Sequence, residues 1–107
     1  LHGGNPPGIV YLTNLYGAGA EYSANERFHT WLGAGSYDNA QTSPSGPAPG
    51  YITGGPNKNY TGPAKGLSEL PSMRAYLDRN DQELFMWEIT EPSIAYQAPY
   101  IQLLSGL

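Results

Sequence analysis

The stretch 33–66 limits what this chain can fold into more than any other feature. Eight Gly and five Pro occupy its 34 positions. Proline interrupts helices and central strands, and glycine weakens both. No helix or strand of ordinary length fits there, so we expect a long irregular loop. Within a compact domain, a loop of such length is either functional or disordered.

The aliphatic content is low for a chain of 107 residues, which forms one domain at most. Leu, Ile, Val and Phe total 19 residues, below the roughly 20% at which an ordinary core becomes doubtful. Nine Tyr and two Trp carry much of the apolar surface instead. Such rings either stack on sugar rings or form small cores that pin the loops, and both interpretations stay open. The rings in or beside the loops are Trp31, Tyr37, Tyr51, Tyr60, Trp87 and Tyr96.

Charge and cysteine content exclude several classes of protein. The formal net charge is −4 with only five Lys and Arg, so no basic surface is available to bind nucleic acid. No apolar stretch approaches the roughly 18 residues that span a bilayer, so we expect no membrane partner. The absence of Cys excludes disulfides and thiolate chemistry. His2 and His29 are the only histidines and lack the spacing of metal ligands, so we assign no metal site.

Short elements are expected before and after the Gly- and Pro-rich stretch. Branched and aromatic residues over 9–15 predict an extended segment. Ser23 followed by Glu26 matches a capping box and predicts a short helix over 23–32. One or two helical turns are expected within 67–79.

The clearest predicted element is a helix over about 90–105. Thr90 suits the N-cap, Pro92 suits the first turn, and Pro99 should kink the helix. Apolar residues wrap most of its circumference, which predicts burial on nearly all sides. Since no second helix is predicted to cover it, we expect a mainly α chain with long irregular loops that is not an independent fold.

Glu91 stands out among the nine carboxylates, most of which should be solvated. Apolar residues just before Glu91 would raise its pKa, whereas a helix N-terminus would lower it. A raised pKa is what a general acid needs near neutral pH. From the residues alone, a charge that complements the helix dipole is the favoured role, and a general acid is the alternative.

Six motifs, in order along nearly the whole chain, resemble the C-terminal segment of a glycoside hydrolase family 9 catalytic domain. Gly4-Asn5-Pro6 resembles the GxNP turn of that family, and the segment 9–13 resembles its SYVTG segment. Phe28-His29-Thr30 lies where the family carries HHR, although His29 is single and Arg27 precedes it instead of following.

The second half of the chain carries the other three motifs. The stretch 49–57 resembles PGxLVGGPN, and 78–81 resembles part of DDRNDY. The ending WEITEPSIAYQAPYIQLL, residues 87–104, resembles NEVAIxYNAPLVxLL. In that signature the Glu is the general acid and a Tyr five residues later faces the sugar, which implies these roles for Glu91 and Tyr96. Glu88 is a rival acid, but the spacing to Tyr96 selects Glu91.

The resemblance implies a fold and a function. Residues 1–107 would be the C-terminal part of an (α/α)6 barrel that hydrolyses β-1,4-glucosidic bonds in cellulose or related β-glucans with inversion. Besides Glu91, it implies substrate contacts for His29, Tyr96, Trp31 and Trp87. No cofactor is required, and a structural calcium is compatible with the family although we assign it no ligands. Secretion is also implied.

One catalytic group of the family is missing from the sequence. Inversion needs two carboxyls about 6.5–9.5 Å apart, and the family's base lies in a DAGD motif that is absent here. We therefore expect the N-terminal portion of the enzyme, or a complementing chain, as a partner. Two alternatives stay open: a non-catalytic β-glucan-binding fragment, and a small independent hydrolase whose base is Asp38, Asp78 or Asp81.

Overall fold

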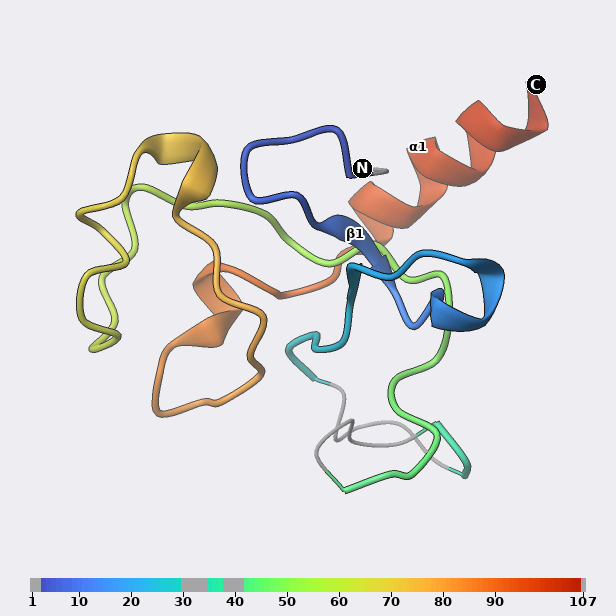
Figure 1. The fold of residues 1–107 in the computed structure, drawn as a ribbon, viewed down its shortest axis with the longest axis horizontal. Helices are drawn as coiled ribbons and strands as arrows, with labels where there is room; N and C mark the ends of the chain where they lie inside the picture. Colours follow the sequence, from blue (N-terminus) through green and yellow to red (C-terminus); the bar gives the residue numbers. More distant parts are fainter. Residues whose placement is uncertain (1–2, 30–34, 38–41, 107) are drawn as a thin grey trace.

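The computed structural model describes residues 3–29, 35–37 and 42–106. Most of these residues form loops and turns (Figure 1). The elements, in chain order, are strand β1 (Val10–Thr13), 3-10 helix η1 (Tyr16–Ala18), strand β2 (Ser23–Ala24), 3-10 helices η3 (Ser72–Arg74) and η4 (Met86–Glu88), and helix α1 (Ile94–Ser105). The expected long irregular stretch and the single α-helix are both present in the part of the chain that is described.

Strand β1 has a neighbour along each edge. It runs parallel to β2, with Val10 opposite Ser23, and the pairing is irregular between Val10 and Thr13. Along its other edge, the Thr13 amide donates to the Tyr51 carbonyl at 2.8 Å, and the Thr53 amide donates to the Tyr11 carbonyl at 3.1 Å. The extended segment predicted over 9–15 is thus confirmed, and the Gly- and Pro-rich stretch supplies one of its neighbours.

The prediction of a short helix over 23–32 is wrong for the described residues of that range. The Ser23 hydroxyl does not cap a helix, because it donates to the Leu12 carbonyl and accepts from the Leu15 amide. The amides of Asn25 and Glu26 donate to the Asp78 carboxylate at 2.8 and 3.0 Å. A distant acidic residue therefore takes the donors that a helical first turn would have used.

Helix α1 is confirmed, but it begins at Ile94 and not at Thr90. Its N-cap is Ser93, whose hydroxyl accepts from the Ala95 amide at 3.0 Å. Thr90 is fully buried and its hydroxyl donates to the Arg79 carbonyl at 2.7 Å. Pro92 favours an extended conformation for the residue before it, so Glu91 lies outside the helix.

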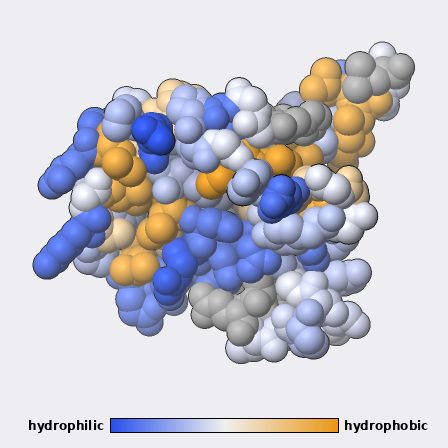
Figure 2. Space-filling view, viewed as in Figure 1, coloured by the Kyte–Doolittle hydropathy of each residue, from blue (hydrophilic) through white to orange (hydrophobic). Residues whose placement is uncertain are grey.

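No residue of α1 is buried, and the helix extends away from the remaining chain (Figure 1). Its apolar side chains form an orange surface in Figure 2, with Ile94 85% and Ile101 65% exposed. The side-chain amide of Gln97 attaches the helix to the 50–53 stretch, because it donates to the Ile52 carbonyl at 2.7 Å and accepts from the Ile52 amide at 3.0 Å. The prediction that this helix is buried on nearly all sides is therefore wrong for the described residues, because no other described element covers it.

Tyrosine rings form much of the core. The ring of Tyr76 meets that of Tyr11 edge-on at 5.0 Å. The Tyr60 hydroxyl donates to the Leu84 carbonyl at 2.6 Å and accepts from the Ala64 amide at 3.0 Å. For Tyr60 the local-core interpretation is therefore correct. The buried cluster consists of Tyr11, Phe28, Tyr60, Leu67, Tyr76, Met86 and Ile89.

One α-helix and a two-stranded sheet are too few elements to show a barrel. Over 67–79, the expected helical turns reduce to η3 and neighbouring turns. In the described part of the chain, no helix has the length and apolarity that crossing a membrane requires.

Candidate active site

His29 and Glu91 meet although 62 positions separate them in the chain. The Phe28 amide donates to the Thr90 carbonyl at 3.2 Å, which aligns the two segments. At the next residues, His29 Nε2 lies 2.8 Å from Glu91 Oε1. Both side chains are accessible, with 40% of His29 and 47% of Glu91 exposed. The contact therefore joins a carboxyl and an imidazole at the protein surface, where a ligand can reach both.

His29 adopts a strained backbone conformation. Its φ is +67°, a left-handed value that non-glycine residues rarely adopt. Such strain persists only where surrounding contacts determine it, and it concentrates at functional sites. The Phe28 ring supplies one of these contacts, because it packs edge-on against the imidazole at 4.5 Å. In this conformation the imidazole contacts Glu91.

Glu91 opens into a small pocket of about 250 Å³, which we call the Glu91 pocket. One wall is the 54–57 loop, the GGPN sequence, and the other comes from the segment before and at the start of α1. Three of the predicted site residues line it together: Trp87, Glu91 and Tyr96. The lining as a whole is Gly54, Gly55, Pro56, Asn57, Trp87, Glu88, Ile89, Glu91, Pro92, Ser93 and Tyr96.

Trp87 and Tyr96 present aromatic surface beside this pocket. Trp87 is 37% exposed and stacks on Phe85, with ring centres 4.6 Å apart. A second ring, that of Phe28, contacts Trp87 edge-on at 5.6 Å. Tyr96, in the first turn of α1, is 48% exposed. The pocket thus combines a carboxyl with flat apolar rings, a combination suited to binding a sugar.

Glu88, the second carboxylate in the pocket lining, has both oxygens occupied. Its Oε2 accepts from the Thr61 amide at 2.7 Å, and its Oε1 accepts from the Thr61 hydroxyl at 2.6 Å. For Glu91, by contrast, no described residue hydrogen-bonds Oε2. Among these two carboxylates, Glu91 is the one with an oxygen available to a ligand.

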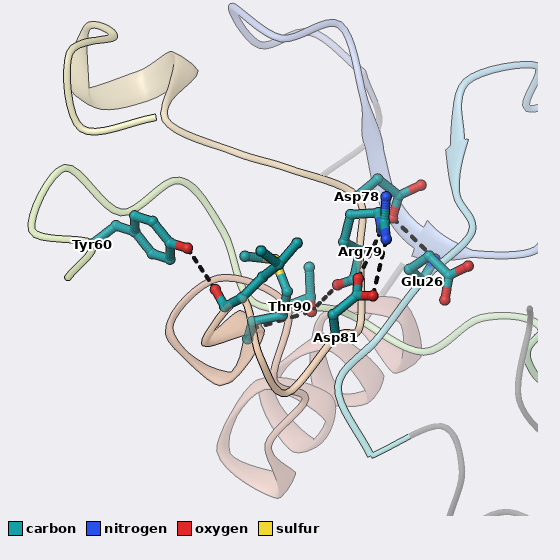
Figure 3. A network of polar contacts seen from close by, with 8 residues as sticks. Glu26, Tyr60, Asp78, Arg79, Asp81 and Thr90 are labelled. Atoms are coloured by element: carbon teal, nitrogen blue, oxygen red, sulfur yellow. Dashed lines mark hydrogen bonds and ion pairs between the residues drawn. The ribbon is translucent and has the colours of Figure 1, made fainter. Parts of the chain in front are cut away.

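Figure 3 shows a second acidic group, in which Glu26, Asp78 and Asp81 lie close to Arg79. Glu26 is only 7% exposed, and burial raises its pKa to about 7, with further increases from Asp78 and Asp81 and a decrease from Arg79. Burial also raises the pKa of Asp78, against two backbone amides that lower it. Hydrogen bonds from the Arg79 guanidinium, at 2.7 and 2.9 Å, lower the pKa of Asp81.

The contacts within this group do not favour Asp78 or Asp81 as the alternative catalytic base. Asp78 binds backbone amides and Asp81 pairs with Arg79, and neither lines the Glu91 pocket. Asp38 lies outside the described residues. The burial of Glu26 was not predicted, because the capping-box pattern assigned Glu26 to the first turn of a short helix. Only its proximity to Phe28 in the chain could have suggested an interior position.

Other predicted residues lie elsewhere. Trp31 falls outside the described residues. The guanidinium of Arg27 lies 4.4 Å from the ring centre of Tyr51, a cation–π contact away from the Glu91 pocket. A larger hollow of about 570 Å³ shares Tyr96 with the Glu91 pocket, but no carboxylate lines it. Of these two hollows, the Glu91 pocket is the one with carboxylates in its lining.

Within the described residues, no cluster of three or more His, Asp or Glu side chains could hold a metal ion. The carboxylates that lie close together are also engaged, Asp78 by backbone amides and Asp81 by Arg79.

The class of protein follows from comparison with known families. A sequence model described as glycosyl hydrolase family 9 matches residues 1–104. The chain therefore belongs to glycosyl hydrolase family 9. Membership supports glycosyl hydrolase activity in general, implies that a carbohydrate is bound, and implies an (α/α)6 barrel of which this chain would be one part. Searches of curated proteins and of solved structures gave no match.

Proposed function

We propose that this chain is the C-terminal part of a catalytic domain that hydrolyses β-1,4-glucosidic bonds in cellulose or related β-glucans. The observation that carries the proposal is Glu91, an accessible carboxyl held by His29 at 2.8 Å and lining a pocket with Trp87 and Tyr96. Glu91 is the general acid, which protonates the leaving glycosidic oxygen. His29 occupies Oε1 and leaves Oε2 directed to the substrate.

The remaining groups bind the sugar and exclude water from it. The faces of Trp87 and Tyr96 pack against glucosyl rings, and Trp31 contributes a further contact. The base that activates water comes from the rest of the domain, because inversion needs a second carboxyl roughly 6.5–9.5 Å away. The reaction needs no cofactor. An enzyme with a polymeric, extracellular substrate of this kind is secreted.

Replacing the acid tests this assignment. In the complete enzyme, Glu91→Gln should lower kcat on cello-oligosaccharides about a thousandfold, since general acid catalysis contributes roughly 10²–10⁴-fold. It should spare a dinitrophenyl cellobioside, whose leaving group needs no proton. The matched control is Glu69→Gln, at an exposed glutamate outside the pocket.

The same preparations test the wider proposal. The first product of the wild-type enzyme should be the α-anomer, as measured by NMR during the first minutes. Equal loss on both substrates would contradict the acid role of Glu91. Binding of cellulose with no turnover at any pH would favour the non-catalytic β-glucan-binding alternative.

A further inference from the structure

The 54–57 loop is joined to the segment that precedes Glu91 by contacts centred on one residue. The carbonyl of Glu88 accepts from the Asn57 side-chain amide at 3.1 Å. The carboxylate of the same residue accepts both donors of Thr61, at 2.7 and 2.6 Å. The main chain and side chain of Glu88 thus bind two points of one loop region.

At the other end of the 54–57 loop, the Gly54 backbone lies against the backbone of the segment that precedes Glu91. A Cβ atom built on Gly54 would lie 2.1 Å from the Ile89 carbonyl oxygen and 3.4 Å from the Glu91 nitrogen. Only glycine permits this approach of two backbones. The 54–57 loop therefore lies directly on residues 88–91, which contribute the opposite wall of the Glu91 pocket.

The Glu88 contacts are strong enough to hold such a loop. Hydrogen bonds to a carboxylate are roughly twice as strong as those between neutral groups. Asn57 is itself fixed, because its side-chain oxygen accepts from the Asn59 amide at 2.9 Å and its own amide donates to the Ala75 carbonyl at 2.9 Å. These bonds leave the loop little freedom to move relative to Glu91.

We propose that Glu88 and Thr61 form a clasp that positions the 54–57 loop, sets the width of the Glu91 pocket and thereby determines how tightly the sugar beside Glu91 is bound. The clasp rests on the proposed function for its substrate, a β-1,4-glucan, but its structural effect can be measured without any substrate. Glu88 is accordingly a positioning residue whose hydrogen bonds matter and whose proton does not.

Three substitutions in the complete enzyme test the clasp through kinetics. Glu88→Ala and Thr61→Val should each raise KM for cello-oligosaccharides, by about tenfold for Glu88→Ala, which removes two charge-assisted bonds, with kcat unchanged. Glu88→Gln should restore most of KM, because its amide can accept from the Thr61 amide and donate to the Thr61 hydroxyl. The control is Glu83→Gln at an exposed glutamate.

Two kinetic outcomes would overturn the clasp. If Glu88→Gln loses kcat as fully as Glu88→Ala, Glu88 is an acid and not a positioning residue. If both Glu88→Ala and Thr61→Val leave KM unchanged, the loop does not depend on these bonds.

Hydrogen exchange decides the question even if the enzyme does not cleave β-1,4-glucans. Glu88→Ala should speed amide exchange over 54–61 about tenfold and leave exchange over β1 unchanged. Glu88→Gln should leave exchange unchanged in both segments. Unchanged exchange over 54–61 would overturn the clasp. Failure of glucan hydrolysis with the expected exchange pattern would overturn the proposed function alone.

Discussion

Glu26 keeps a carboxyl group in the interior with its Oε2 atom unpaired. Asp78, with its own carboxylate, and Tyr16 and Tyr76, with their hydroxyls, are the neighbours that interact with it electrostatically, besides Asp81 and Arg79. Burial and the two negative neighbours favour the neutral form, which brings the pKa of Glu26 to about 7. The segment that leads to His29 therefore carries a group that gains a charge close to neutral pH.

This burial predicts a pH-dependent stability. The pKa of Glu26 rises from 4.5 unfolded to about 7 folded, so its contribution is fully favourable below 4.5 and is lost as the pH rises to about 7. Glu26→Gln removes this loss, and we expect it to raise the free energy of unfolding by about 3 kcal/mol at about pH 8, relative to its effect near pH 4. Urea denaturation at both pH values measures the difference.

The control for this prediction is Glu83→Gln, at an exposed glutamate. It should change the stability little and equally at both pH values. An effect of Glu26→Gln that is the same at both pH values would show that Glu26 does not titrate in this range.

Much of the candidate site was predictable from the residues and the family resemblance, but its geometry was not. Glu91, Trp87 and Tyr96 were expected together, because they lie within ten positions of each other. In the sequence, only the spacing to Tyr96 distinguished Glu91 from Glu88 as the general acid. In the structure, Thr61 hydrogen-bonds both carboxylate oxygens of Glu88. The left-handed φ of His29 was not predicted, because His29 is not a Gly, the residue type that most readily adopts such a value.

At the scale of elements, α1 depends on one polar side chain for its attachment to the 50–53 stretch. Gln97 makes a two-way hydrogen bond with the backbone of Ile52, a residue only 6% exposed. Ile52 in turn bridges to Leu12 in β1. These contacts connect α1 to the Gly- and Pro-rich stretch, and they connect that stretch to β1.

Gln97→Ala should loosen this connection. It leaves the amide and carbonyl of Ile52 without their partner, which should lower the free energy of unfolding by about 2 kcal/mol. Amide exchange over α1 should also accelerate. Gln102→Ala is the matched control, because Gln102 lies exposed on the same helix. Equal effects of the two substitutions would show that the Ile52 contact contributes nothing.

Elements were predictable where local preference and tertiary contacts agree. Branched and aromatic residues predicted β1 correctly. The helix α1 was predicted from its terminal residues and forms although no described element covers it. The start of α1 was misplaced because the Thr90 hydroxyl bonds the distant Arg79 carbonyl instead of a helical amide. The helix expected over 23–32 failed because Asp78 binds the amides of Asn25 and Glu26.

On the scale of the whole molecule, the chain is compact and yet leaves an apolar helix uncovered. Its radius of gyration is 13.6 Å, close to the roughly 13 Å of a folded chain of this length. The core nevertheless leaves α1 out, since no residue of α1 is buried. Family membership implies a barrel in which other helices would cover this surface.

A charge placed on α1 should distinguish the isolated chain from the complete domain. In the chain alone, Ile101→Glu should change the stability by less than about 0.5 kcal/mol, because Ile101 is 65% exposed. In the complete domain, it should cost about 3 kcal/mol or more through a buried charge. Thermal unfolding of both forms measures this, with Gln102→Glu as the control. An equally small effect in both would show that α1 stays uncovered.

The 62 positions between His29 and Glu91 have a kinetic consequence. Closing a loop of that length costs about 4 kcal/mol of chain entropy, whereas one hydrogen bond returns only about 1 kcal/mol. The pair therefore cannot close its own loop and forms only once Phe28, Met86 and Ile89 have condensed. During refolding, the imidazole and the carboxyl should therefore meet only after this core has formed.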